Sequence, residues 1–215
     1  KNDSIMKKLL ILLFSFFLYS PSVFADDISD FQIEGISLGD SLLDYMTEDE
    51  ILLEIEQTKN HYSYLNEPNK YAEVYSNIKL DNNFTTFDYL SFYVKNNETN
   101  NYITNKNEKF TILGIRGFTR YVEDFESCMQ KRDEIVEILS KMFPNEQKTK
   151  VFFEHGLDPS GNSFIYEISF AFDLGGKIEA ECIDFEETFR IKNSYTEGLA
   201  VGISYEEIIN WISDY

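Results

Sequence analysis

FIYEISFAFDLGGKIEAEC, residues 164–182, is the stretch that decides the fold. From Phe164 to Leu174 every second residue is apolar, and this period of two is typical of a β-strand. Gly175 and Gly176 then form a two-residue turn. The segment after the turn points two sets of side chains to opposite sides: Ile178, Ala180 and Cys182 to one, and Glu179 and Glu181 to the other. The stretch therefore predicts an antiparallel pair of strands with one buried face.

Further strands are predicted on both sides of this pair. Asp158-Pro159-Ser160-Gly161-Asn162 has the composition of a hairpin loop, so a strand should precede it. Alternation and turn signals predict strands at 71–78, 86–95, 110–116 and 151–155, and an edge strand at 189–192.

Helices are predicted where apolar residues recur every three or four positions. The longest is Val122–Phe143, which Pro144 follows as a stop signal. Thr47 with Glu50 forms a capping box before a second helix, and Ser204 with Glu207 forms another before a final helix. The order of elements predicts an α+β fold. We expect an antiparallel sheet of about five to seven strands, with the long helix and the terminal helices packed on it.

The first 25 residues resemble a secretory signal peptide. Lys7 and Lys8 precede the apolar run Leu9–Leu18, and Val23-Phe24-Ala25 fits a cleavage site. The apolar run is about half the length that a bilayer core requires. We therefore expect a signal peptide at 1–25, a single exported domain at 26–215, and no stable membrane span after cleavage. The expected location is the periplasm or the exterior.

The chain contains two cysteines, Cys128 and Cys182. Cys128 falls on the apolar face of the long predicted helix, and Cys182 on the apolar face of a predicted strand. An even number of cysteines in an exported protein favours a disulfide. We predict a structural Cys128–Cys182 bond between helix and sheet.

The formal net charge of −19 limits the classes of partner. Such a surface repels phosphate backbones and anionic membranes, and it favours cations, cationic peptides or basic protein patches. The acidic run of Glu179, Glu181, Asp184, Glu186 and Glu187 is expected to be a solvated face rather than a loose site for divalent cations. We predict no metal or cofactor, because no His pair at helical spacing, no Cys-x-x-Cys and no nucleotide-binding glycine motif is present.

Two overlapping strings resemble hydrolase motifs. Residues 35–39 read G-x-S-x-G around Ser37, and residues 39–42 read GDSL, which resembles the first block of the GDSL hydrolases. That resemblance implies Ser41 as nucleophile and a late Asp-x-x-His as base. Here His155 precedes Asp158, the reverse order, and a serine without a positioned base is a weak nucleophile. We therefore expect Asp40 or Ser41 to cap a short helix. His155 and Asp158 are expected to complete the hydrogen bonds of a turn.

A second resemblance covers most of the chain. It rests on IEGISLGDSLLDYMTEDEI (33–51), on the single cysteine of the long helix, on HGLDPSGNS (155–163) and on Cys182-Ile183-Asp184. With these motifs the chain resembles a group of small, uncharacterised exported proteins of marine bacteria. The resemblance implies an exported domain and carries no activity.

Three functions are compatible with these patterns. The leading prediction is a non-enzymatic exported binding or interaction domain whose ligand is unknown. One alternative is a serine hydrolase that uses Ser41 or Ser37 with His155. Another is a structural or assembly factor of the cell envelope.

Overall fold

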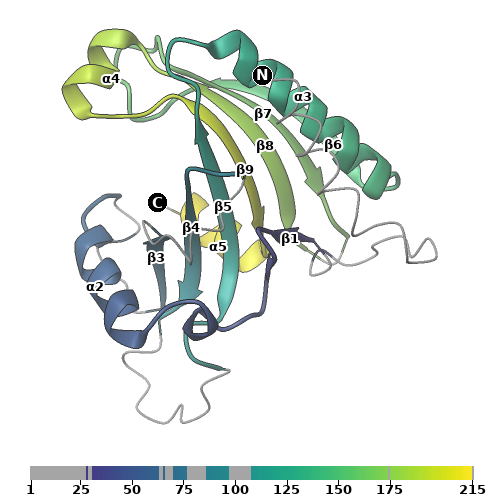
Figure 1. The fold of residues 1–215 in the computed structure, drawn as a ribbon. Coiled ribbons are helices and arrows are strands. Elements are labelled where there is room, and N and C mark those ends of the chain that lie inside the picture. Colours follow the sequence, from purple (N-terminus) through teal and green to yellow (C-terminus); the bar gives the residue numbers. More distant parts are fainter. Residues whose placement is uncertain are drawn as a thin grey trace, which may run out of the picture.

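A computed structural model describes residues 28, 31–62, 65, 70–76, 86–96, 108–173 and 175–214. Its main element is one seven-stranded antiparallel sheet with the strand order β3-β4-β5-β9-β8-β7-β6, so the predicted α+β class is confirmed (Figure 1). The predicted signal peptide lies outside the described residues.

The strands of the sheet are β3 (Tyr71–Ser76), β4 (Tyr89–Lys95), β5 (Ile112–Arg120), β6 (Gln147–Glu154), β7 (Phe164–Ala171), β8 (Lys177–Asp184) and β9 (Gly198–Ser204). Two short strands of two residues each, β1 (Gln32–Ile33) and β2 (Ile36–Ser37), form a separate hairpin. The helices are α2 (Glu48–Thr58), α3 (Phe125–Met142), α4 (Glu187–Asn193) and α5 (Glu206–Ser213), with the short 3-10 helix η2 (Leu42–Asp44) before α2.

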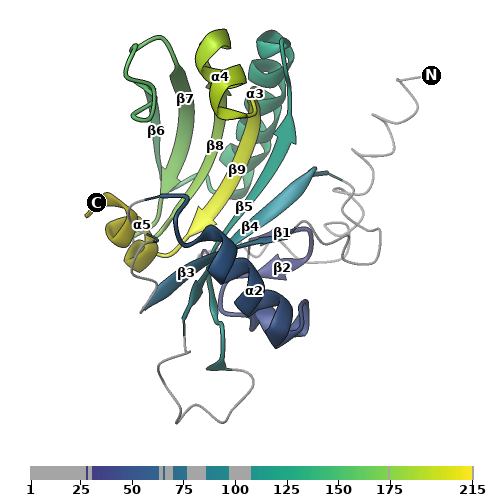
Figure 2. The same cartoon turned by 90° about the vertical axis from the view of Figure 1, so that its left-hand side faces the viewer.

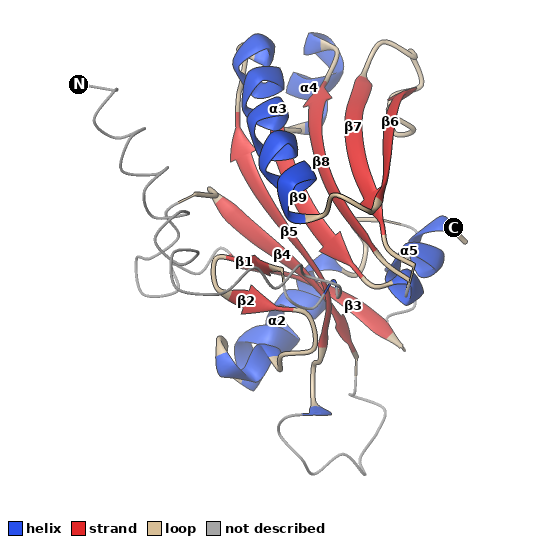
Figure 3. Ribbon diagram, turned by 90° about the vertical axis from the view of Figure 1, so that its right-hand side faces the viewer, coloured by secondary structure: helices blue, strands red, loops and turns tan. Residues whose placement is uncertain are grey.

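Helix α3 covers one face of the sheet, where it packs on β8 and β9 (Figure 3). The side chains below it alternate along each strand, as predicted, and Ile178, Ala180 and Cys182 are all buried. Cys128 on α3 forms a disulfide with Cys182, and their Cα atoms lie 6.0 Å apart. The predicted disulfide is confirmed, and it joins the long helix to the centre of the sheet.

The caps predicted for the two helices nearest the N-terminus are confirmed. The hydroxyl of Ser41 accepts a hydrogen bond from the Leu43 amide at 3.3 Å and so caps η2. Thr47 and Glu50 form the capping box of α2. Each cap supplies an oxygen to backbone amides that have no partner within the helix.

Three predictions for the rest of the chain are wrong. Residues 189–192 belong to helix α4, whose start is fixed because the Glu186 carboxylate accepts from the Phe189 amide at 2.6 Å. Ser204 ends β9 and does not cap α5, which begins after Tyr205 without a side-chain cap. Strand β5 continues past Gly117 to Arg120.

Strand β9 was not predicted, because two glycines in GLAVGIS look like strand breakers. The sheet requires small residues there. A Cβ atom on Gly198 would lie 2.1 Å from the carbonyl oxygen of Thr119 on the paired strand β5. The glycine therefore reflects a close approach of two backbones within the sheet.

Candidate functional site

The sheet face opposite α3 carries charged side chains in its centre. Figure 2 shows this face, with α4 at its upper end and α5 at its lower end. Residues directly opposite each other in paired strands point to the same side. The register brings two cations at strand ends to this face, Lys95 on β4 and Arg120 on β5, and six charged residues to its central part: Glu73 on β3, Arg116 on β5, Glu167 on β7, and Lys177, Glu179 and Glu181 on β8. We call these six residues the polar face.

Arg116 pairs with Glu181 across the intervening strand β9. The guanidinium can cross this strand because Gly202, which lies between Arg116 and Glu179 in the register, has no side chain. A Cβ atom at Gly202 would lie 3.0 Å from Oε1 of Glu179. The expectation that Glu181 is solvated is thus wrong: it is buried and ion-paired.

Lys177 forms ion pairs with two further carboxylates of the polar face. Its Nζ atom lies 3.3 Å from Oε1 of Glu167 and is also paired with Glu179. Burial raises the pKa of Glu181, Arg116 opposes that rise, and the negative charges of Glu179 and Glu167 add to it. Among the six residues of the polar face, two cations therefore accompany four carboxyl groups, and the cations Lys95 and Arg120 lie at its margins.

Glu73 is the most deeply buried carboxyl group of the polar face. Its residue is 3% exposed, and among the described residues its Oε2 atom has no hydrogen-bond partner. Burial raises the pKa of Glu73 to about 7, although Arg116 and hydrogen bonds from Tyr75, Tyr93 and Ser91 oppose the rise. A buried polar atom without a partner is costly and is rare in folded proteins.

Tyrosine rings border the polar face. Tyr62 and Tyr89 lie close enough to Glu73 and Arg116 for their charges to affect the phenols, and burial raises the pKa of both. The ring of Tyr89 stacks on Phe118 with centroids 5.1 Å apart. These phenols therefore stay neutral at physiological pH and present π faces and hydroxyl groups beside the carboxylates.

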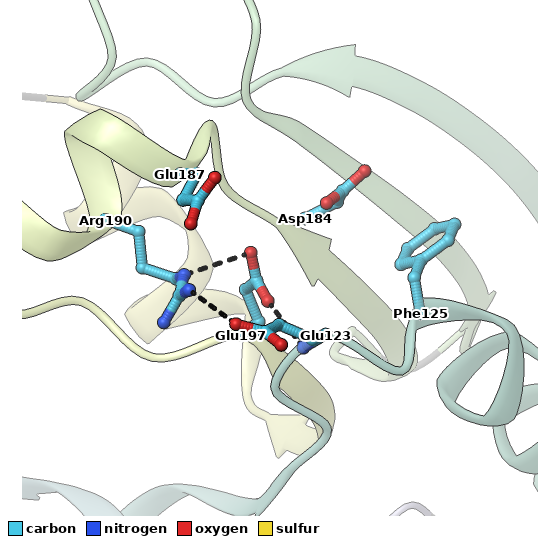
Figure 4. A pocket seen from close by; sticks show the side chains of 6 residues that line it. All are labelled: Glu123, Phe125, Asp184, Glu187, Arg190 and Glu197. Carbon is cyan, nitrogen blue, oxygen red and sulfur yellow. Dashed lines mark hydrogen bonds and ion pairs between the residues drawn. The ribbon is translucent and has the colours of Figure 1, made fainter.

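A pocket of about 470 Å³ lies at the end of the sheet, between α4 and the start of α3 (Figure 4). Arg190 reaches into it and pairs through Nε with Oε1 of Glu197 at 3.3 Å and through Nη2 with Oε1 of Glu123 at 3.8 Å. Burial raises the pKa of Asp184 in the same pocket, and Glu197 adds to the rise. The residues lining this α4 pocket are Glu123, Phe125, Asp184, Glu187, Arg190 and Glu197.

The serine candidates lie far from His155. The Ser41 hydroxyl donates to the carbonyl of Lys109 at 2.8 Å, and Ser41 bridges Thr111 just before β5 begins. His155 packs on Phe185 beyond the far end of β5, with ring centroids 4.7 Å apart. Nine residues of strand separate these two levels, which corresponds to about 30 Å. The structure therefore does not bring the two groups together.

The remaining candidates form local hydrogen bonds. Ser37 accepts from the Gln32 side chain at 3.0 Å in the β1–β2 hairpin. His155 accepts at Nδ1 from the Leu157 amide at 3.3 Å, and burial lowers its pKa. Asp158 accepts from the hydroxyls of Ser160 at 2.8 Å and Ser163 at 2.6 Å.

The Ser163 bond is the main reason that the pKa of Asp158 lies below its ordinary value. His155 and Asp158 thus organise the β6–β7 loop. In the described part of the chain, no group of three or more His, Cys, Asp or Glu residues is placed to hold a metal ion. No helix in that part is long and apolar enough to cross a membrane.

Sequence reasoning did not identify Glu73, Arg116 or Glu197 as site residues. A signal existed for the first two: each is the one charged residue of a predicted strand that is mostly apolar or aromatic. Comparison with family models, with curated protein sequences and with solved structures gives no match. The site must therefore be interpreted from its own chemistry.

Proposed function

We propose that the protein is a non-enzymatic exported binding domain, and that its ligand presents an ammonium or guanidinium group to the polar face. The observation that carries this proposal is the buried Oε2 atom of Glu73, which has no partner among the described residues. A cationic donor would satisfy this atom and would compensate the excess of carboxyl groups among the six residues of the polar face.

The energetic cost of the polar face supports a binding role. Burying carboxylates costs several kcal/mol each unless they are paired and hydrogen-bonded. Arg116 and Lys177 compensate only part of the charge of the four carboxyl groups. Groups with strongly perturbed pKa values concentrate at functional sites, and Glu73 is such a group.

The surrounding tyrosines suit an organic cation. A cation above a tyrosine ring gains about 0.5–2 kcal/mol, more when water is excluded. Tyr62, Tyr89 and Tyr93 lie near the charged groups of the polar face. Arg116 and Lys177 keep side chains that are 31% and 29% exposed, so the edge of the face is open to a ligand.

The placement of the serines supports a non-enzymatic role. Ser41 is 3% exposed, and its hydroxyl is engaged in both the cap of η2 and the bond to Lys109. The disulfide between Cys128 and Cys182 supports export, because such bonds persist in oxidising compartments. Intact mass of the protein recovered from the periplasm should correspond to cleavage after Ala25, and retention of Lys7 would contradict export by this signal.

Binding is tested by calorimetry with putrescine, spermidine and a trilysine peptide, against glutamate and citrate at equal ionic strength. We expect heat from the cations only, and tighter binding at pH 8 than at pH 6, because ionised Glu73 attracts the ligand more strongly. A protein that binds none of the three cations, or binds the anions equally well, would contradict the proposal.

Variants locate the site. Glu73→Gln should weaken binding of the best cation by roughly tenfold or more, the loss of one charge-assisted hydrogen bond. The matched control Glu137→Gln removes a carboxylate that is 71% exposed on α3 and should leave binding unchanged. Binding that survives Glu73→Gln but disappears in Asp184→Asn/Glu187→Gln would move the site to the α4 pocket.

A further inference from the structure

Strand β6 forms an open edge of the sheet (Figure 3). Among the described strands it pairs with β7 alone, and all eight of its residues are exposed. Three consecutive apolar side chains project from it: Val151, Phe152 and Phe153 are 36%, 57% and 41% exposed. An exposed edge strand of this length offers a row of unpaired backbone groups to another strand.

The register fixes which backbone groups of β6 point outward. The His155 amide donates to the Ser163 carbonyl at 2.7 Å, and this pair continues the β6–β7 ladder one residue beyond Glu154 and Phe164. In an antiparallel pair, residues that bond to the partner alternate with residues that point away. Residues 147, 149, 151 and 153 therefore bond to β7, and residues 148, 150, 152 and 154 point outward.

We propose that β6 pairs antiparallel with β6 of a second copy of this chain, which joins the two sheets across a twofold axis. One register gives every outward-pointing residue an outward-pointing partner. In that register Lys148 lies opposite Glu154 of the second copy, and Lys150 lies opposite Phe152 of the second copy. The twofold axis repeats both pairs, and Val151 lies opposite its own equivalent.

The charges of this edge favour a second copy as the occupant. In a chain with net charge −19, β6 carries two lysines and one glutamate. Lysine on an edge strand ordinarily discourages strand addition. Here the register that satisfies the most backbone groups also places each Lys148 against a carboxylate, so the edge is complementary to itself. The contact lies outside the polar face, and the inference is independent of the proposed function.

Sedimentation equilibrium of the purified protein tests this pairing. We expect a monomer–dimer equilibrium whose dissociation constant rises about tenfold or more for Lys148→Glu and for Glu154→Lys, because each reversal replaces two attractive cross-strand pairs with repulsive ones. The double variant Lys148→Glu/Glu154→Lys restores opposite charges and should return the constant to within about threefold of the unmodified protein. Lys192→Glu makes the same charge change at an exposed position on α4 and should have no effect.

Three results would overturn the inference. The first is a protein that stays monomeric over the whole concentration range, including one that instead captures an acidic extended peptide at β6. The second is a dimer that the single reversals leave unchanged, which would place the interface elsewhere. The third is a double variant that remains as weak as the single variants, which would exclude this register.

Discussion

Replacing Glu73 with glutamine should change how the stability of the protein depends on pH. The folded pKa of Glu73 is about 7, against an ordinary value of 4.5. The folded state therefore binds a proton more tightly than the unfolded state does. This difference stabilises the fold fully below pH 4.5, and the contribution is lost as the pH rises through 7.

The size of the effect follows from the difference between the two pKa values. Each pKa unit corresponds to about 1.4 kcal/mol, so the wild-type protein should lose about 3 kcal/mol between pH 4.5 and pH 8.5 through this group. Glutamine has nearly the shape of the protonated acid and does not ionise. Glu73→Gln should therefore match the wild type near pH 4.5 and exceed its free energy of unfolding by about 3 kcal/mol at pH 8.5.

Urea unfolding at pH 4.5, 6, 7 and 8.5 measures this difference. The control is Glu137→Gln, which removes an exposed carboxylate from α3. Its difference from the wild type should stay small at all four pH values. A Glu73→Gln curve that runs parallel to the wild-type curve from pH 4.5 to 8.5 would refute the claim that Glu73 is buried without sufficient compensation.

Three further predictions concern the stability of the fold: the disulfide, the cap of η2 and a glycine of β9. Reduction of the Cys128–Cys182 bond, which closes a loop of 54 residues, should lower the free energy of unfolding by about 4 kcal/mol, measured in urea with and without dithiothreitol; an unchanged midpoint would contradict this role. Ser41→Ala should cost about 1–2 kcal/mol in a thermal melt, because the cap and the hydrogen bond to a distant carbonyl are lost together, and a variant as stable as the wild type would show that Asp40 suffices. Gly198→Ala should destabilise by about 3 kcal/mol or more, because the added methyl would lie 2.1 Å from the Thr119 carbonyl oxygen; a soluble variant with an unchanged melting temperature would disprove this close approach.

Local patterns in the sequence were sufficient to predict most of the helices and strands. Alternation from Phe164 onward and the three- and four-residue spacing in 122–143 predicted β7, β8 and α3, because these patterns follow directly from strand and helix geometry. The caps at Ser41 and Thr47 were predictable because each capping side chain bonds to a residue no more than three positions along the chain. The disulfide followed from two apolar faces that had to meet.

Tertiary structure alone decided the composition of the candidate site. Strand β9 lies between β5 and β8 although it comes last among the strands, and no local signal gives that position. Only this insertion brings Arg116 to Glu181 across Gly202, so an acidic run that looks solvated in sequence contains a buried ion pair. Likewise, nothing in the local sequence around Glu73 in β3 indicates that its carboxyl group is buried, because the residues that bury it come from other strands. Burial, charge balance and unpaired atoms depend on residues far apart in the chain, and this is the physical reason that the fold class could be derived from the sequence while the site required the structure.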